Sequence, residues 1–184
     1  LHPASYNPFQ SGYAFAEVAH EYLNRRDAWH ASIEALKELA GYASKRGLVL
    51  GLENMPNAVV LNGLLLRVPR FATGRGELLS ILSEVQNGLR LTFDVGHANT
   101  ICQPSDYVKG IVSQIAHIHL HDNDGICDQH TPLGSGTVGL DKLFQALKEE
   151  GYSESIVIER PIDAALLEDI GKLRHYISGT PGFT

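Results

Sequence analysis

The chain has 184 residues, a formal net charge of −6, 43% hydrophobic and 20% charged residues, and two cysteines. These values are typical of one globular domain, and the acidic balance argues against broad binding to nucleic acid or to an anionic membrane. No stretch of sequence has the length of a membrane span, nothing resembles a signal peptide, and two cysteines are too few for a disulfide framework. We therefore expect a cytoplasmic protein.

Strand and helix patterns alternate from the start of the chain. A strand remnant ends at His2, and apolar residues then recur at helical spacing over residues 27–45. The continuous apolar run at residues 48–52 is typical of a strand covered on both faces, and it ends in Glu53. Residues 55–75 contain Pro, Asn and Gly and are predicted to form a long loop.

The alternation continues through the middle of the chain. A helix is predicted over residues 77–85, followed by a strand over 89–93 that ends in Asp94. A short helix is predicted over residues 105–113 and a strand over 115–120.

The last third of the chain repeats the pattern after a Gly-rich loop at residues 122–137. Apolar residues on one face predict an amphipathic helix over residues 139–150. A strand follows over residues 155–158 and ends in Glu159, and a final helix is predicted over residues 163–177.

Five strand–helix units fit two fold classes, an open doubly wound sheet or part of a (β/α)8 barrel. The sequence contains neither G-x-G-x-x-G nor G-x-x-x-x-G-K-[ST], so a nucleotide-binding fold has no support from a phosphate-binding motif. In either class we expect parallel strands in chain order with the helices outside. Their C-terminal ends would then bring side chains together on one face.

Four successive strands end in residues that can bind a metal ion: Glu53, Asp94, His119 and Glu159. Three carboxylates and one imidazole suit a divalent ion such as Zn²⁺, Mn²⁺, Mg²⁺ or Fe²⁺. A single strand-end carboxylate more often caps a helix or forms a surface ion pair. Because four such residues occur in succession, we favour a metal site.

The segment Asp94-Val95-Gly96-His97 is the sharpest local motif. Gly96 permits a tight turn that would bring His97 back over the site, although a plain strand-to-helix turn explains the same residues.

Further histidines and an aspartate follow the strand at residues 115–120. His119 stands at the strand end, His117 lies deeper, and His121 is a candidate for substrate binding or for supporting a ligand. Asp128 and His130 can chelate a second ion, although this spacing is common in polar loops.

Together these motifs resemble the xylose isomerase-like TIM-barrel superfamily, which holds sugar and sugar-phosphate isomerases and epimerases and nucleases of the endonuclease IV type. The strings that carry the resemblance are Leu1-His2-Pro3, Leu52-Glu53-Asn54, Phe93-Asp94-Val95-Gly96-His97, His119-Leu120-His121-Asp122, Asp128-Gln129-His130, Gly134-Ser135-Gly136 and Ile158-Glu159.

The resemblance implies that residues 1–178 are strands 4–8 of such a barrel with their helices, that the first three βα units are absent, and that residues 179–184 are a tail. The chain would be either a fragment or a natural truncation. An isolated piece would expose two strand edges, so we expect it to need the missing barrel segment or a homo-oligomer.

For function, the resemblance implies a metal-dependent isomerase or epimerase that acts on a small sugar through a metal-bound enediolate. Glu53, Asp94, His119 and Glu159 would hold the metal, and Glu53 and Glu159 would also exchange protons with the substrate. His97 would orient the substrate.

We also expect His121 and Asn54 to contact the substrate.

The nuclease is the alternative function. Residues matching His2, His97, Asp128 and His130 complete a zinc cluster in that branch and would form a second metal site here. The loop at residues 123–129 has no Lys or Arg, which disfavours DNA as a substrate. A third possibility is an inactive or partner-requiring truncated barrel.

Overall fold

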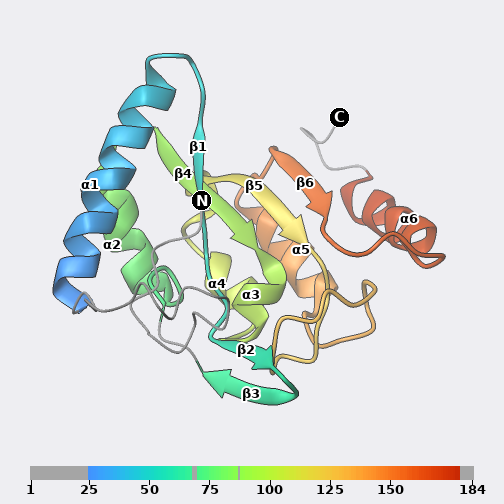
Figure 1. Ribbon diagram of the computed structural model, residues 1–184. Coiled ribbons are helices and arrows are strands. Elements are labelled where there is room, and N and C mark those ends of the chain that lie inside the picture. The colour runs from blue at the N-terminus through green and yellow to red at the C-terminus, as the bar shows by residue number, and fades with distance from the viewer. Residues whose placement is uncertain (1–24, 68–69, 87, 179–184) are drawn as a thin grey trace.

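Four parallel strands form the central sheet of the computed structural model, which describes residues 25–67, 70–86 and 88–178 (Figure 1). The strands lie in the order β1-β4-β5-β6 and all pair in parallel. Their bounds are Leu50–Glu53, Leu89–Asp94, Ile115–Leu120 and Ser155–Ile158. Parallel pairing in chain order is therefore confirmed for these strands, while the strand expected to end at His2 lies outside the described residues.

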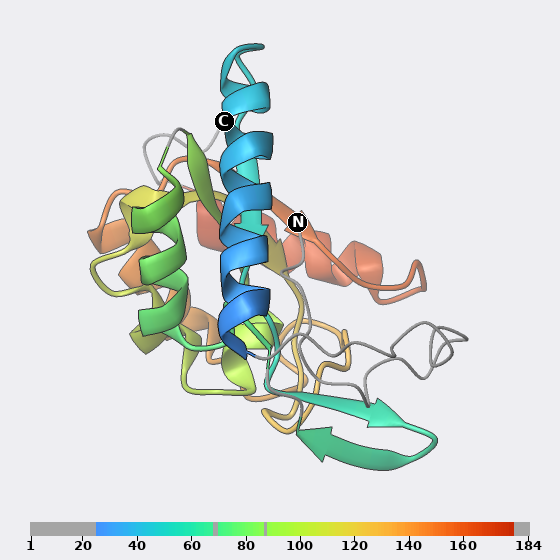
Figure 2. The same cartoon turned by 60° about the vertical axis from the view of Figure 1, so that its left-hand side comes forward.

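Helices precede or follow each of these strands. Their bounds are α1 Arg25–Ser44, α2 Arg75–Val85, α3 Val95–Asn99, α4 Pro104–Val108, the 3-10 helix η2 Val112–Gln114, α5 Leu140–Glu149 and α6 Leu166–Ile177. Helix α1 packs against β1 and α2, and α2 packs against β4 (Figure 2). Within the described part of the chain, no helix combines the length and apolarity that a bilayer crossing requires.

Two predicted helices differ from the structure. The helix expected over residues 105–113 is divided into α4 and η2, because Gly110 between them adopts a φ of 72°, which ends an α-helix. The last helix begins at Leu166 because Asp163 lies in the preceding turn, where it accepts hydrogen bonds from Arg160 and from the backbone N–H of Ala165.

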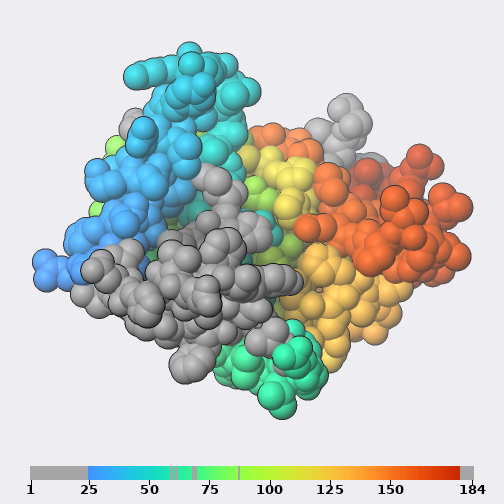
Figure 3. Space-filling model, in the orientation of Figure 1, coloured from blue at the N-terminus to red at the C-terminus, as the bar shows by residue number. Residues whose placement is uncertain are grey.

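The predicted loop over residues 55–75 is wrong in part, because an antiparallel hairpin lies within it. Strand β2 (Ala58–Leu61) pairs with β3 (Leu64–Arg67). Asn62 and Gly63 connect them, with φ values of 51° and 77°. An Asn-Gly pair with two positive φ values suits the two-residue turn that joins twisted strands. The hairpin lies at the lower edge of the molecule in the space-filling view (Figure 3).

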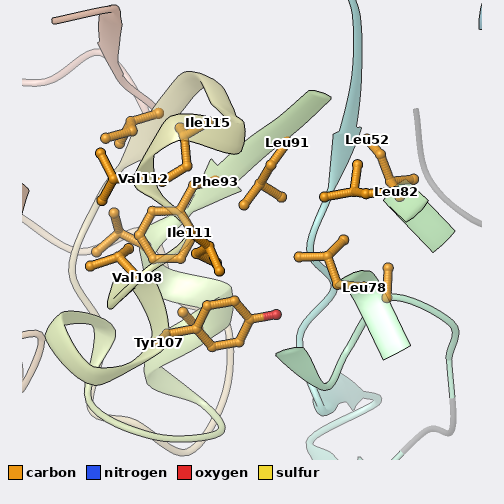
Figure 4. Close-up of a cluster of buried hydrophobic side chains, with 14 of the residues drawn as sticks. Leu52, Leu78, Leu82, Leu91, Phe93, Tyr107, Val108, Ile111, Val112 and Ile115 are labelled. Carbon is orange, nitrogen blue, oxygen red and sulfur yellow. The ribbon is translucent and has the colours of Figure 1, made fainter. Parts of the chain in front are cut away.

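Apolar side chains between the sheet and its helices form the core (Figure 4). Leu52, Leu91 and Phe93 project from the strands and are completely buried. The Phe93 ring lies 5.6 Å from that of Tyr107 in α4, measured between centroids. Burying one such side chain is worth about 1.5–3 kcal/mol relative to exposing it. This core fixes the strands whose C-terminal ends carry the polar residues described next.

Candidate metal centre

Four potential ligands meet at the C-terminal edge of the sheet. Glu53 ends β1, Asp94 ends β4, His119 lies near the end of β5, and Glu159 follows β6. Each offers one oxygen or nitrogen atom, and these atoms lie within 4.8 Å of one another. The parallel register explains the convergence, since Asp94 is the direct partner of His119 across β4 and β5.

His119 lies at the centre of this group. Its Nδ1 atom lies 3.6 Å from Glu53 Oε1, 3.9 Å from Asp94 Oδ2 and 2.5 Å from Glu159 Oε2. The Glu53 carboxylate, followed by the charges of Glu159 and Asp94, raises the pKa of His119 against the opposing effect of burial. Both His119 Nδ1 and Glu159 Oε2 are buried without a hydrogen bond. Two buried polar atoms that face each other without forming a regular hydrogen bond, in a set of one imidazole and three carboxylates, fit a divalent cation.

The group has a closed side and an open side. The side chains of Glu53 and Asp94 are 9% and 0% exposed, whereas those of His119 and Glu159 are 23% and 44% exposed.

Asn54 joins the ends of β1 and β4. Its side-chain amide donates to Asp94 O at 2.9 Å, and its Oδ1 accepts from Asp94 N at 2.8 Å. Asn54 is fully buried. These contacts hold the backbone of Asp94 at the end of β4, and the expected contact of Asn54 with the substrate stays a prediction.

The turn after Asp94 is both a strand-to-helix turn and the means by which His97 is brought to the site, as the two interpretations of the Asp94–His97 motif predicted. Asp94 Oδ1 accepts from the backbone N–H of His97 at 2.7 Å and so caps α3. The same turn brings His97 Nδ1 to 3.4 Å from Glu53 Oε1. A Cβ atom at position 96 would lie 1.9 Å from His121 Cε1, so only glycine fits beside that imidazole.

A second group surrounds Asp128. His97 Nε2 and His130 Nε2 lie 3.2 Å and 3.1 Å from Asp128 Oδ2. His121 Nε2 lies 3.5 Å from Asp128 Oδ1, which makes no hydrogen bond. One ligand atom each from His121, Asp128 and His130 fall within 4.8 Å of one another. The structure thus brings together His97, Asp128 and His130 of the predicted second site, whereas His2 lies outside the described residues.

Two of these histidines hold protons on both ring nitrogens. His97 Nδ1 faces Asn54 O at 2.8 Å, and His130 Nδ1 faces Glu159 O at 2.6 Å. A carbonyl oxygen only accepts, so each Nδ1 donates, and each Nε2 donates to the Asp128 carboxylate.

The pKa values agree with this assignment. Burial lowers the pKa of His97, but hydrogen bonding to Asp128 and the charges of Asp94 and Asp128 raise it to about 9. Hydrogen bonding to Asp128 raises the pKa of His130 to about 9, and together the histidines hold the pKa of Asp128 well below its usual range. If the two histidines lose the protons on Nε2, these nitrogens and the Asp128 carboxylate form a donor set that fits a metal ion.

His121 lies between the two groups. It follows β5 and is completely buried, with Nε2 at 3.2 Å and 3.3 Å from the two Asp94 oxygens. Its ring stacks on that of His130 at 3.9 Å between centroids. We expected His121 either to contact the substrate or to support a ligand. A fully buried imidazole between Asp94 and Asp128 fits the supporting role and links the two groups, while the substrate contact stays a prediction. His117 lies farther from the edge and contacts Ser155 Oγ.

Asp122 was not predicted to have a role, yet it organises the loop that carries Asp128 and His130. Its buried carboxylate accepts from the backbone N–H groups of Asn123, Gly134 and Val138 at 2.9–3.2 Å. An aspartate at the head of a Gly-rich loop was the available signal, because such loops expose N–H groups that a carboxylate can accept.

Comparisons with known proteins identify the fold family. The family model described as xylose isomerase-like TIM barrel matches residues 2–176. Two uncharacterised proteins of Methanocaldococcus jannaschii are 36% and 29% identical over 132 and 122 residues. These matches cover 70% and 66% of this chain but 42% and 43% of the relatives, so the chain spans less than half of their length.

Solved structures agree. A D-tagatose 3-epimerase-like protein is 28% identical with a TM-score of 0.76, covering 96% of this chain and 60% of that one. The 3-keto-D-glucoside 4-epimerase YcjR of E. coli is 17% identical (TM-score 0.68; 94% and 62% covered), and a D-allulose 3-epimerase of Methylomonas sp. is 24% identical (0.60; 79% and 48%). The last two show the fold alone. Of the two fold classes open from the sequence, the barrel is confirmed.

Proposed function

The chain belongs to the xylose isomerase-like TIM-barrel family, and we propose that it forms the catalytic part of a divalent-metal-dependent isomerase or epimerase of small ketoses or their phosphates. The observation that carries the proposal is the group formed by Glu53, Asp94, His119 and Glu159 at the C-terminal edge of the sheet. The likeness to a D-tagatose 3-epimerase-like protein supports the substrate class.

The two glutamates suit proton transfer. Glu53 and Glu159 both contact His119 Nδ1, and they come from opposite edges of the described sheet. A substrate carbon between them could lose a proton to one carboxylate and receive a proton from the other. A divalent ion held by the four ligands would polarise the sugar carbonyl and so acidify the neighbouring C–H.

His97 suits the role of orienting the substrate. Its imidazole carries two N–H groups, is mostly buried, and lies 3.4 Å from Glu53 Oε1. A fixed imidazole beside the acid/base carboxylate can direct a sugar hydroxyl towards it, provided that the Nε2 contact with Asp128 opens.

Proton exchange tests this proposal. The full-length protein loaded with Mn²⁺ is incubated in deuterated water with a panel of ketoses and ketose phosphates. We expect deuterium at the carbon next to the carbonyl, and we expect Glu159→Gln to reduce its incorporation by about 10²–10⁴-fold. Glu154→Gln is the matched control, because Glu154 pairs with Arg90 at the surface. No exchange on any sugar would contradict the proposal.

A second candidate is a zinc-dependent nuclease for abasic sites. The contacts of His97 and His130 with Asp128 favour it, because they prepare a second metal position. The net charge of −6 weighs against a DNA substrate. Incision of abasic DNA by protein that leaves every ketose unlabelled would favour the nuclease, and absence of both activities would favour an inactive barrel.

A further inference from the structure

Helix α6 meets the rest of the molecule through a buried carboxylate. Of its residues Leu166–Ile177, Asp169 alone is fully buried. A helix on the outside of a sheet ordinarily buries apolar side chains at such a position. The contacts of Asp169 therefore need an explanation beyond the packing of α6.

Asp169 bridges two segments that are distant in sequence. Its Oδ1 accepts from the backbone N–H of Leu133 at 3.0 Å, and its Oδ2 accepts from Arg160 Nη1 at 2.9 Å. The Arg160 side chain is 3% exposed, so this ion pair is buried. The guanidinium also pairs with Asp163, whose side chain is 50% exposed.

Both bridged segments lead directly to the candidate metal centre. Arg160 follows Glu159, and Leu133 lies three residues after His130. The segments also touch at the site itself, where His130 Nδ1 donates to Glu159 O at 2.6 Å. The backbone of His130 adopts a φ of 51°, a conformation that is uncommon for residues other than glycine.

Net stability alone is a weak reason for a buried ion pair, because the loss of hydration of both charges offsets most of their attraction. In some proteins a buried pair fixes the geometry of the segments that it joins, because its two partners tolerate few other arrangements. Here the fixed distance lies between the strand end that carries Glu159 and the loop that carries Asp128 and His130.

We propose that Asp169 is a positioning residue of the metal centre. One oxygen holds the segment after Glu159 through Arg160, and the other holds the loop after His130. The two halves of the site thereby keep the separation that binding and proton transfer require. This inference rests on the proposed function, and the competing account is that Asp169 only attaches α6 to the barrel.

Three variants of the full-length protein separate these accounts. Asp169→Asn removes the buried charge and leaves the guanidinium of Arg160 with Asp163 as its charged partner, and the loss of the buried counter-charge can prevent folding. The double variant Arg160→Gln with Asp169→Asn removes both charges and keeps amide groups that can form hydrogen bonds. Asp163→Asn is the matched control, because it removes the exposed partner of the same guanidinium.

Two measurements need no sugar substrate. The first measurement compares the rates of amide hydrogen exchange in residues 128–134 and in β5 of the metal-free protein. The second is a titration with CoCl₂, which gives the affinity for Co²⁺ and the absorption spectrum of the bound ion. In the double variant we expect unchanged exchange in β5, faster exchange in residues 128–134, and Co²⁺ binding weaker by about 10–100-fold with an altered spectrum. Where the wild type converts a ketose, kcat should fall more than KM rises. Asp163→Asn should match the wild type.

A double variant that folds and keeps the Co²⁺ affinity and absorption spectrum of the wild type would overturn the inference. Failure of both Asp169 variants to fold would also overturn it, because the ion pair would then be needed for folding alone. A wild-type protein that binds Co²⁺ but labels no ketose would contradict the proposed function, while the Co²⁺ and exchange data would still decide the role of Asp169. A wild type that binds no Co²⁺ would overturn both.

Discussion

Single residues of this site satisfy structural and chemical demands at once. Asp94 caps α3, is held by Asn54, and presents a carboxylate to His119 and His121. Gly96 is needed because His121 occupies the space of a side chain. Substitutions at these positions are therefore expected to affect stability and metal binding together.

The contact between Gly96 and His121 gives the first prediction. Gly96→Ala should destabilise the protein by about 1–3 kcal/mol, because the added Cβ would lie 1.9 Å from the His121 ring. Chemical denaturation measures the change. Gly76→Ala in α2, where a Cβ meets nothing within 4 Å, should be neutral or slightly stabilising. Equal effects of the two substitutions would contradict the packing argument.

Protonation of the group around Asp128 gives the second prediction. In the metal-free protein, His97 and His130 have pKa values of about 9, above the ordinary 6.5. Their contribution to stability is fully present below pH 6.5 and is lost as the pH rises through 9. The pKa of Asp128 is lowered, so its contribution is present above its ordinary value of 3.8 and is lost in acid.

Denaturation of the metal-free protein across this range measures the effect. Stability should fall from pH 6.5 to 9, and Asp128→Asn should flatten that decline. A stability that rises over this range, with no change in Asp128→Asn, would show that the two histidines are not held protonated by Asp128.

At the scale of elements, the sequence predicts the four described sheet strands well because their signals are local. Each is a short segment in which apolar residues predominate, and strands β5 and β6 agree with their predicted bounds. The same locality identified Glu53, Asp94, His119 and Glu159 as residues at strand ends. The hairpin β2–β3 was missed although Asn62-Gly63 between apolar runs is itself a local hairpin signal.

The remaining features depend on contacts between distant segments. The burial of His121 depends on the close approach of α3, and the role of Asp169 depends on where Leu133 and Arg160 meet. The spacing of residues within one segment does not show which distant segments meet. Periodicity and motifs therefore could not predict the burial of His121 or the contacts of Asp169.

The link between β1 and β4 gives the third prediction. Asn54→Ala should destabilise the protein by about 1–3 kcal/mol, because the buried backbone N–H and C=O of Asp94 lose their partners. Calorimetric titration with Mn²⁺ should also show weaker binding, since Asp94 loses its anchor. Asn57→Ala, which removes the side-chain hydrogen bond from Asn57 to Thr100 O, is the comparison. Unchanged Mn²⁺ affinity with a raised KM would favour the predicted substrate contact.

At the scale of the whole molecule, the candidate metal centre depends on the complete sheet. Its four ligands come from four strands, between Glu53 and Glu159 in sequence. The chain covers 60% of the D-tagatose 3-epimerase-like structure, and β1 and β6 are the edges of the described sheet. We propose that a further barrel segment or a second copy covers these edges, which parallel sheets rarely leave open.

Diffraction from crystals of the full-length protein soaked in Mn²⁺ tests the central claim most directly. The anomalous signal of the ion locates it without reference to activity. We expect a peak bounded by Glu53, Asp94, His119 and Glu159, with ligand atoms about 2.0–2.3 Å away, and we expect the peak to disappear in Glu159→Gln. Absence of a peak between these four side chains in the wild type, at an ion concentration that saturates binding in solution, would contradict the account.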